Sequence, residues 1–227
     1  MNIGNVLRRV VPPSVYESIL AKSSLTPATA TPSVKAVAQP SASIGQLAPS
    51  PASVVQPVSV PIERPSVIRE ASVLDLLKMH GQIIDELRER KIIRTGNAPL
   101  GDYAELLFAT AFGWTLSDNS AAGHDAIDER GVRYQIKARR VTSASKSRQL
   151  SAIRKLPDKT FDMLAAVIFD ADYQVQRAIL LPHAEVEARA SRVEHTNSWR
   201  LIMDDRVWKA VGAIDVTKPL AMAALNI

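Results

Sequence analysis

Apolar side chains recur at helical spacing in two stretches in the middle of the chain. Between residues 72 and 90 they fall on one face of a helix, and Ser72 followed by Asp75 resembles the capping box that begins many helices. A second helix is predicted over residues 101–112, with Gly113 as its C-terminal stop. These two helices are expected to begin the folded part of the chain.

The pattern then changes to the two-residue period of β-strands. Residues 132–138 alternate between apolar and polar side chains after a reverse-turn signal at Gly131, which predicts a β-hairpin. Two more strands are predicted at 161–169 and 174–181, and the first has the composition of a buried strand.

A short helix is predicted at 182–190, beginning with a proline. The tail, 199–227, is predicted to contain a strand, a short helix at 204–210 and a final irregular segment. This order of elements is typical of an α/β protein in which a small mixed central sheet is flanked by helices.

Composition divides the chain into three parts. Residues 24–66 hold eight of the fourteen prolines and only three charged side chains, so they are predicted to be a disordered Pro/Ala/Ser-rich linker that buries little surface. Residues 1–23 are a short segment with a helix predicted at 12–23, and residues 67–227 are the predicted folded domain. The N-terminal region is interpreted either as a tether that presents its helix to a protein partner or as a tail without a specific role.

The absence of cysteine and of long apolar runs excludes several kinds of site and segment. The chain has no cysteine, which excludes disulfides, thiolate zinc sites and a cysteine nucleophile. No apolar run approaches the ~18 residues that span a bilayer, and the N-terminus lacks the apolar region of a secretory signal. We therefore expect a cytoplasmic protein that does not associate with membranes, and the sequence predicts no particular oligomeric state.

Positive charge is concentrated in one segment. The net charge is +5, but between Arg130 and Lys159 there are ten basic residues and one acid, Asp158. This segment therefore carries +9, and the rest of the chain sums to −4. A local positive field of this kind favours a polyanionic partner such as a nucleic acid.

The candidate catalytic residues are Glu105, Asp125, Gln135 and Lys137. Two carboxylates, an amide oxygen and a lysine are groups that can hold a divalent cation and support attack of water on a phosphodiester. Structural interpretations are also open. Glu105 can form a reciprocal helix cap with Asp102, Asp125 can be a turn former, and the strand face of Gln135 and Lys137 can simply be solvated.

Together these residues resemble the PD-(D/E)XK phosphodiesterase superfamily, which has the restriction-endonuclease-like fold. The resemblance covers about residues 74–181 and leaves residues 1–66 outside. Within the superfamily, this stretch is similar to uncharacterised bacterial and phage domains. The motifs that carry it are Arg94-Thr95-Gly96-Asn97, Gly101-Asp102-Tyr103-Ala104-Glu105, Gly123-His124-Asp125-Ala126-Ile127-Asp128 and Tyr134-Gln135-Ile136-Lys137-Ala138-Arg139.

The resemblance implies a metal-dependent endonuclease that hydrolyses phosphodiester bonds, in DNA rather than RNA. The implied ligands of Mg²⁺ or Mn²⁺ are Asp125, Gln135, the backbone carbonyl of Ile136 and Glu105. Lys137 is then the motif lysine, which orients the attacking water and stabilises the developing charge. The chain departs from the pattern in two ways: no proline precedes Asp125, and Gln135 stands where an acid is usual, so the site offers less charge to a metal.

The predicted nucleic-acid contacts are Arg94, Arg139, Arg140, Lys146 and Arg148. They would hold phosphates by charge, so that binding is salt-dependent and largely blind to base sequence. Two alternatives stay open. One is a nucleic-acid-binding module of the same fold with weak or no catalysis, which the glutamine favours; the other is an adaptor protein that acts through its N-terminal segment.

Overall fold

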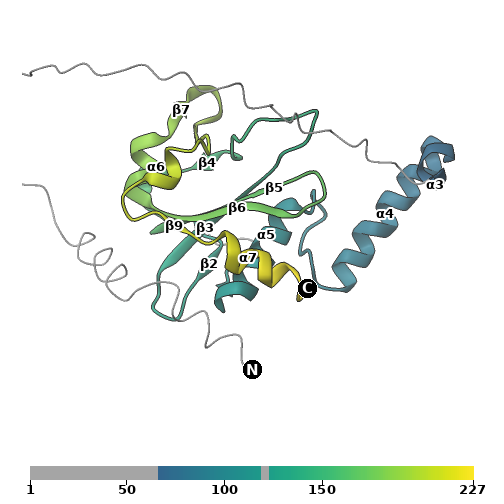
Figure 1. Ribbon diagram of the computed structural model, residues 1–227, viewed down its shortest axis with the longest axis horizontal. Coiled ribbons are helices and arrows are strands. Elements are labelled where there is room, and N and C mark those ends of the chain that lie inside the picture. The colour runs from purple at the N-terminus through teal and green to yellow at the C-terminus, as the bar shows by residue number, and fades with distance from the viewer. Residues whose placement is uncertain (1–65, 119–122) are drawn as a thin grey trace, which may run out of the picture.

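A mixed, mostly antiparallel sheet lies at the centre of the computed structural model, which describes residues 66–118 and 123–227 (Figure 1). Its six strands lie in the order β1-β2-β3-β5-β6-β9. Strands β3 and β5 pair in parallel, and the other neighbouring strands of this sheet pair antiparallel. The strands are β1 (Thr115–Leu116), β2 (Ala126–Ile127), β3 (Arg133–Arg140), β5 (Met163–Phe169), β6 (Val175–Pro182) and β9 (Ile214–Asp215).

Two layers cover this sheet. Helices α5 and α7 pack on one face, and α6 packs on the other beside a small antiparallel sheet in the order β4-β8-β7. The α/β class with a central sheet flanked by helices is therefore confirmed. The remaining elements are α3 (Ser66–Glu70), α4 (Val73–Glu89), α5 (Leu100–Phe112), α6 (His183–Arg189), α7 (Thr217–Ala224), β4 (Ile153–Arg154), β7 (Ser191–Val193), β8 (Ser198–Arg200) and the 3₁₀ turns η1 (Leu156–Asp158), η2 (Glu194–Thr196) and η3 (Val207–Lys209).

Strand β5 explains why one segment of the chain is apolar without interruption. Met163, Ala165 and Val167 belong to the core under α5 and α7, whereas Leu164 and Ala166 belong to the core on the opposite face. A strand buried on both faces cannot alternate between apolar and polar residues. Every residue of β5 is accordingly buried.

Local signals set the ends of the two long helices as the sequence predicts. The Ser72 side chain accepts a hydrogen bond of 3.2 Å from the backbone N–H of Asp75, which caps the start of α4. Gly113 ends α5 in the left-handed conformation with φ of 70°, which glycine adopts without a steric cost. The hairpin and the strands β5 and β6 are also confirmed.

Other predictions differ from the structure. The segment predicted to be irregular at the C-terminus forms β9 and α7, because Leu220 and Ala223 pack into the core beside α5. The helix predicted at 204–210 is reduced to the single turn η3. The predictions for residues 1–65, a helix at 12–23 and a disordered linker, lie outside the described residues, and Ser66, the last residue assigned to the linker, begins α3.

Helices α3 and α4 form an arm that extends away from the sheet (Figure 1). Ile84, near the C-terminal end of the arm, is buried at 9% exposure, while its neighbour Ile83 is 58% exposed. No helix among residues 66–118 and 123–227 is long and apolar enough to cross a membrane. The exposed large apolar side chains of the arm are Val67, Ile68, Val73, Leu74, Leu76, Leu77 and Ile83.

Candidate functional site

Glu105 lies in the first half of α5 and is largely enclosed, with 17% of its side chain exposed. Burial raises the pKa of the Glu105 carboxyl above its ordinary value, and the nearby charges of Asp125 and Asp102 act in the same direction. The Arg94 guanidinium opposes this rise, because it is in ion-pair contact with Glu105. Glu105 is therefore a carboxylate whose need for positive charge Arg94 meets only in part.

The loop before α5 holds Arg94 in place. Asp102 Oδ2 accepts hydrogen bonds from the backbone N–H groups of Arg94 at 2.8 Å and Thr95 at 2.7 Å, and from the Thr95 hydroxyl at 3.0 Å. The prediction that Asp102 and Glu105 form a reciprocal helix cap is therefore wrong. The N-cap residue of α5 is Pro99, which makes no side-chain capping bond.

Asp125 directly precedes β2, the strand that pairs with β3, and hydrogen bonds fix it there. Its backbone N–H donates to the Tyr134 carbonyl at 2.8 Å, and its backbone carbonyl accepts from the Ser117 N–H at 2.9 Å. Its side-chain Oδ2 accepts from the backbone N–H of Ile136 at 2.6 Å and from the side-chain amide of Gln135. Asp125 is thus held by both neighbouring segments of the sheet.

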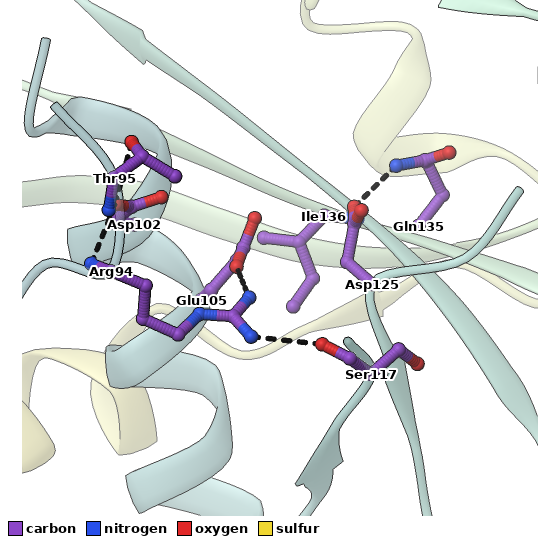
Figure 2. A network of polar contacts seen from close by, with 8 residues as sticks. All are labelled: Arg94, Thr95, Asp102, Glu105, Ser117, Asp125, Gln135 and Ile136. Carbon is purple, nitrogen blue, oxygen red and sulfur yellow. Dashed lines mark hydrogen bonds and ion pairs between the residues drawn. The ribbon is translucent and has the colours of Figure 1, made fainter. Parts of the chain in front are cut away.

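The two carboxylates come from different elements and face a common region (Figure 2). In this view the Ile136 side chain lies between Glu105 and Asp125, and the Arg94 guanidinium reaches Glu105 while donating to the Ser117 carbonyl at 2.8 Å. The Asp125 charge helps to raise the pKa of the Glu105 carboxyl, so the two carboxylates interact electrostatically.

Strand β3 supplies the other two candidate catalytic residues. Ile136 points into the core under α5, and Gln135, on the alternate face, is buried at 9% exposure. The interpretation of the strand face of Gln135 as solvated is therefore wrong at Gln135, whose side chain is buried and donates to Asp125. The Lys137 side chain is half-buried and makes no hydrogen bond or ion pair with any other residue in the described part of the chain.

The loop after β3 extends the basic surface. Arg139 lies on the same strand face as Lys137, and it donates to the Ser145 hydroxyl at 2.7 Å and to the Ser147 carbonyl at 2.9 Å. These bonds fold the 142–147 loop back toward β3. Lys146, inside this loop, is exposed and is free to meet a phosphate.

Arg140 and Arg148, like Arg94 and Arg139, are predicted nucleic-acid contacts that are engaged within the protein. Arg140 donates to the Ala171 carbonyl at 3.0 Å and lies over the Tyr173 ring, 4.4 Å from its centre. Arg148 forms an ion pair of 3.1 Å with Asp205. Both arginines have internal partners that a bound phosphate would have to replace or share.

A divalent cation at this site would need oxygen ligands from Glu105, Asp125 and strand β3. The described residues contain no group of three or more histidine, cysteine, aspartate or glutamate side chains placed to hold a metal. The candidate donor set is all oxygen, the type of ligand that Mg²⁺ and Mn²⁺ accept: the carboxylates of Glu105 and Asp125, the Gln135 amide oxygen and the Ile136 carbonyl. The set fits if Arg94 leaves Glu105 and the Gln135 amide, which now donates to Asp125, turns its oxygen inward.

Sequence reasoning did not find the roles of Asp102, Ser117 or Asp162. Asp162 accepts two hydrogen bonds from the Arg133 guanidinium, at 2.9 and 3.1 Å, and one from its backbone N–H at 2.9 Å. These partners are separated along the chain by 29 positions, and no local pattern marks such pairs.

Two comparisons with known proteins identify no relative of this chain. A scan of the chain against protein-family models finds no match, and a search of the curated proteins finds no similar sequence.

Proposed function

We propose that this protein is a metal-dependent nuclease that hydrolyses phosphodiester bonds in DNA, and that its sheet belongs to the restriction-endonuclease-like fold. One observation carries the proposal: the Asp125 carboxylate is bound by Gln135 and by the Ile136 N–H of β3 and interacts with the enclosed Glu105 of α5, and the same strand bears Lys137. An enclosed acid with a raised pKa, such as Glu105, is typical of functional sites, and the Lys137 side chain has no partner in the described chain.

Each residue has a distinct role in the proposed reaction. Asp125 and Glu105 hold the cation together with Gln135 and the Ile136 carbonyl, and the cation, when bound, polarises the phosphate and lowers the pKa of a coordinated water. Lys137 donates to the attacking water or to a non-bridging phosphate oxygen and so stabilises the charge that develops there. Its amino group is available for this because no other residue in the described chain engages it.

The basic surface along β3 supports a polyanionic substrate. Lys137 and Arg139 share one face of the strand, and the loop that Arg139 holds presents Lys146 to solvent. Such contacts are made to the phosphate backbone, so that affinity depends on salt and little on base sequence.

A second candidate function is a DNA-binding module that has lost catalysis. The observation that favours it is that both carboxylates already have partners without a metal: Gln135 donates to Asp125, and Arg94 is in ion-pair contact with Glu105. A glutamine cannot supply the negative charge that an acid would bring to a cation.

The test is incubation of the protein with supercoiled and linear DNA in Mg²⁺, Mn²⁺ or EDTA, beside Asp125→Ala and Lys137→Ala. We expect cleavage that requires the metal and falls about 100-fold or more in both variants. DNA affinity of Lys137→Ala, measured by fluorescence anisotropy in EDTA, should change by no more than about threefold, because one phosphate contact of several is lost.

Lys218→Ala is the matched lysine control, since Lys218 is exposed on α7 and has no place in the proposed site. It should leave cleavage and binding unchanged. Salt-sensitive DNA binding by all variants without cleavage in any metal would instead support the binding module. A parallel loss of binding and cleavage in Lys137→Ala would refute the division of roles given to this lysine.

A further inference from the structure

We propose that Arg94 is a displaceable counter-cation: it occupies Glu105 in the free protein and exchanges with the divalent cation when a DNA phosphate draws its guanidinium away. Metal and DNA then bind cooperatively, so that the site is loaded only on its substrate. This inference rests on the proposed function and adds a mode of regulation to the same site.

Arg94 and a metal would need the same carboxylate. The guanidinium is in ion-pair contact with Glu105 Oε2, and its other amino group donates to the Ser117 carbonyl at 2.8 Å. Figure 2 shows the guanidinium directly beside Glu105, on the side of the site where Ser117 lies. Two cations that share a largely enclosed carboxylate repel each other, so occupancy by one lowers the affinity for the other.

A nearby cation stabilises the enclosed Glu105 carboxylate. Glu105 is 17% exposed and lies near the charge of Asp125, and an enclosed pair of like charges without compensation is costly. Arg94 provides compensation in the free protein. A divalent ion provides more, because it can be shared by both carboxylates.

The geometry allows Arg94 to leave without disturbing the fold. Its backbone N–H is fixed by Asp102 at 2.8 Å, and the next residue is fixed by the same carboxylate. Its side chain, in contrast, is 31% exposed and can rotate toward solvent. A guanidinium binds phosphate through paired hydrogen bonds, so a DNA backbone is a suitable alternative partner for Arg94.

The experiment titrates Mn²⁺ into the full-length protein without DNA and measures free Mn²⁺ by electron paramagnetic resonance. We expect Arg94→Gln to bind Mn²⁺ about tenfold more tightly than the wild type, a coupling of the usual size between two linked sites. Arg189→Gln is the matched control, because Arg189 makes a similar ion pair with Glu185 on α6, and it should leave Mn²⁺ affinity unchanged.

A second titration adds a duplex oligonucleotide in a Lys137→Ala background, in which the DNA is expected to stay intact. DNA should increase Mn²⁺ affinity when Arg94 is present and have little effect when Arg94→Gln is added. Arg94→Lys, which keeps the positive charge, should bind Mn²⁺ as the wild type does, and it serves as the folded comparison if Arg94→Gln is unstable.

Two negative results have different meanings. If Arg94→Gln leaves Mn²⁺ affinity unchanged or lowers it while Asp125→Asn abolishes binding, the exchange is refuted and the proposed metal site stands. If Asp125→Asn does not weaken Mn²⁺ binding, both the proposed metal site and the exchange are refuted.

Discussion

At the scale of single residues, two carboxylates with arginine partners, Asp162 and Glu105, have pKa values shifted in opposite directions. Burial would raise the pKa of Asp162, but hydrogen bonds from the Arg133 guanidinium and backbone outweigh it and hold that pKa below its ordinary value. For Glu105, burial together with neighbouring acids outweighs Arg94, and the pKa rises. Asp162 is therefore a satisfied structural group, whereas Glu105 retains a demand for positive charge.

The Asp162 pair predicts a pH dependence of stability. A carboxylate whose folded pKa lies below its ordinary value of 3.8 stabilises the protein above that pH, and this contribution is lost as the pH falls through the folded pKa. Asp162→Asn should lower the free energy of unfolding by about 1 kcal/mol at neutral pH, a value discounted because Arg133 is 38% exposed. Urea unfolding at neutral pH and below pH 3.8 measures both effects.

The difference between variant and wild type should shrink as the pH falls from 3.8 through the folded pKa, since the carboxylate is protonated first in the unfolded chain and then in the folded protein. Asp158→Asn is the control, because Asp158 is an exposed aspartate in the same crossover segment. A difference that persists undiminished at low pH would contradict the assignment of the stabilisation to the charged form.

At the scale of elements, α4 is amphipathic along its whole length but packs against the domain only near its C-terminal end. Ile83 and Ile84 are adjacent and chemically identical, yet they differ in exposure from 58% to 9%. The periodicity of the helix therefore identifies its apolar face, and the position of the sheet decides how much of that face is covered.

These two isoleucines make a matched pair. Ile84→Ala should destabilise the protein by about 2 kcal/mol, because it removes buried methyl groups, whereas Ile83→Ala should change stability by less than about 0.5 kcal/mol. Denaturant unfolding of both variants is the measurement. Equal losses would mean that Ile83 is also covered in solution.

At the scale of the whole molecule, the two core clusters are built between Leu100 and Ala224. None of the buried residues in these clusters comes from the arm. The domain boundary near residue 67 remains a prediction, and the distribution of the core makes it testable by truncation.

A chain that begins at Ser66 should unfold at the same urea concentration and with the same m-value as the full chain, because both clusters stay complete. A chain that ends at Val216 lacks α7 and with it Leu220, which is fully buried, and should be markedly less stable. A lower midpoint for the N-terminal truncation would show that residues 1–65 contribute to folding.

Local chemistry in the sequence determined the helices α4 and α5, the hairpin around Gly131 and the buried strand β5. Each has a signal within a few residues: a serine cap, a C-terminal glycine, a turn, or an apolar run bounded by turns. The types of residue in the candidate site were also evident, since carboxylates, an amide and a lysine stand at motif spacing.

The tertiary structure alone decided which of these groups meet and in what state. The Arg94–Glu105 contact joins residues 11 positions apart, and Asp102 holds a loop where the sequence suggested a helix cap. Gln135 is buried and turned toward Asp125, although strand alternation suggested a solvated face. Periodicity reports which side of an element is apolar, but the partner of a charged group depends on how distant elements pack, and that information is absent from any short stretch of sequence.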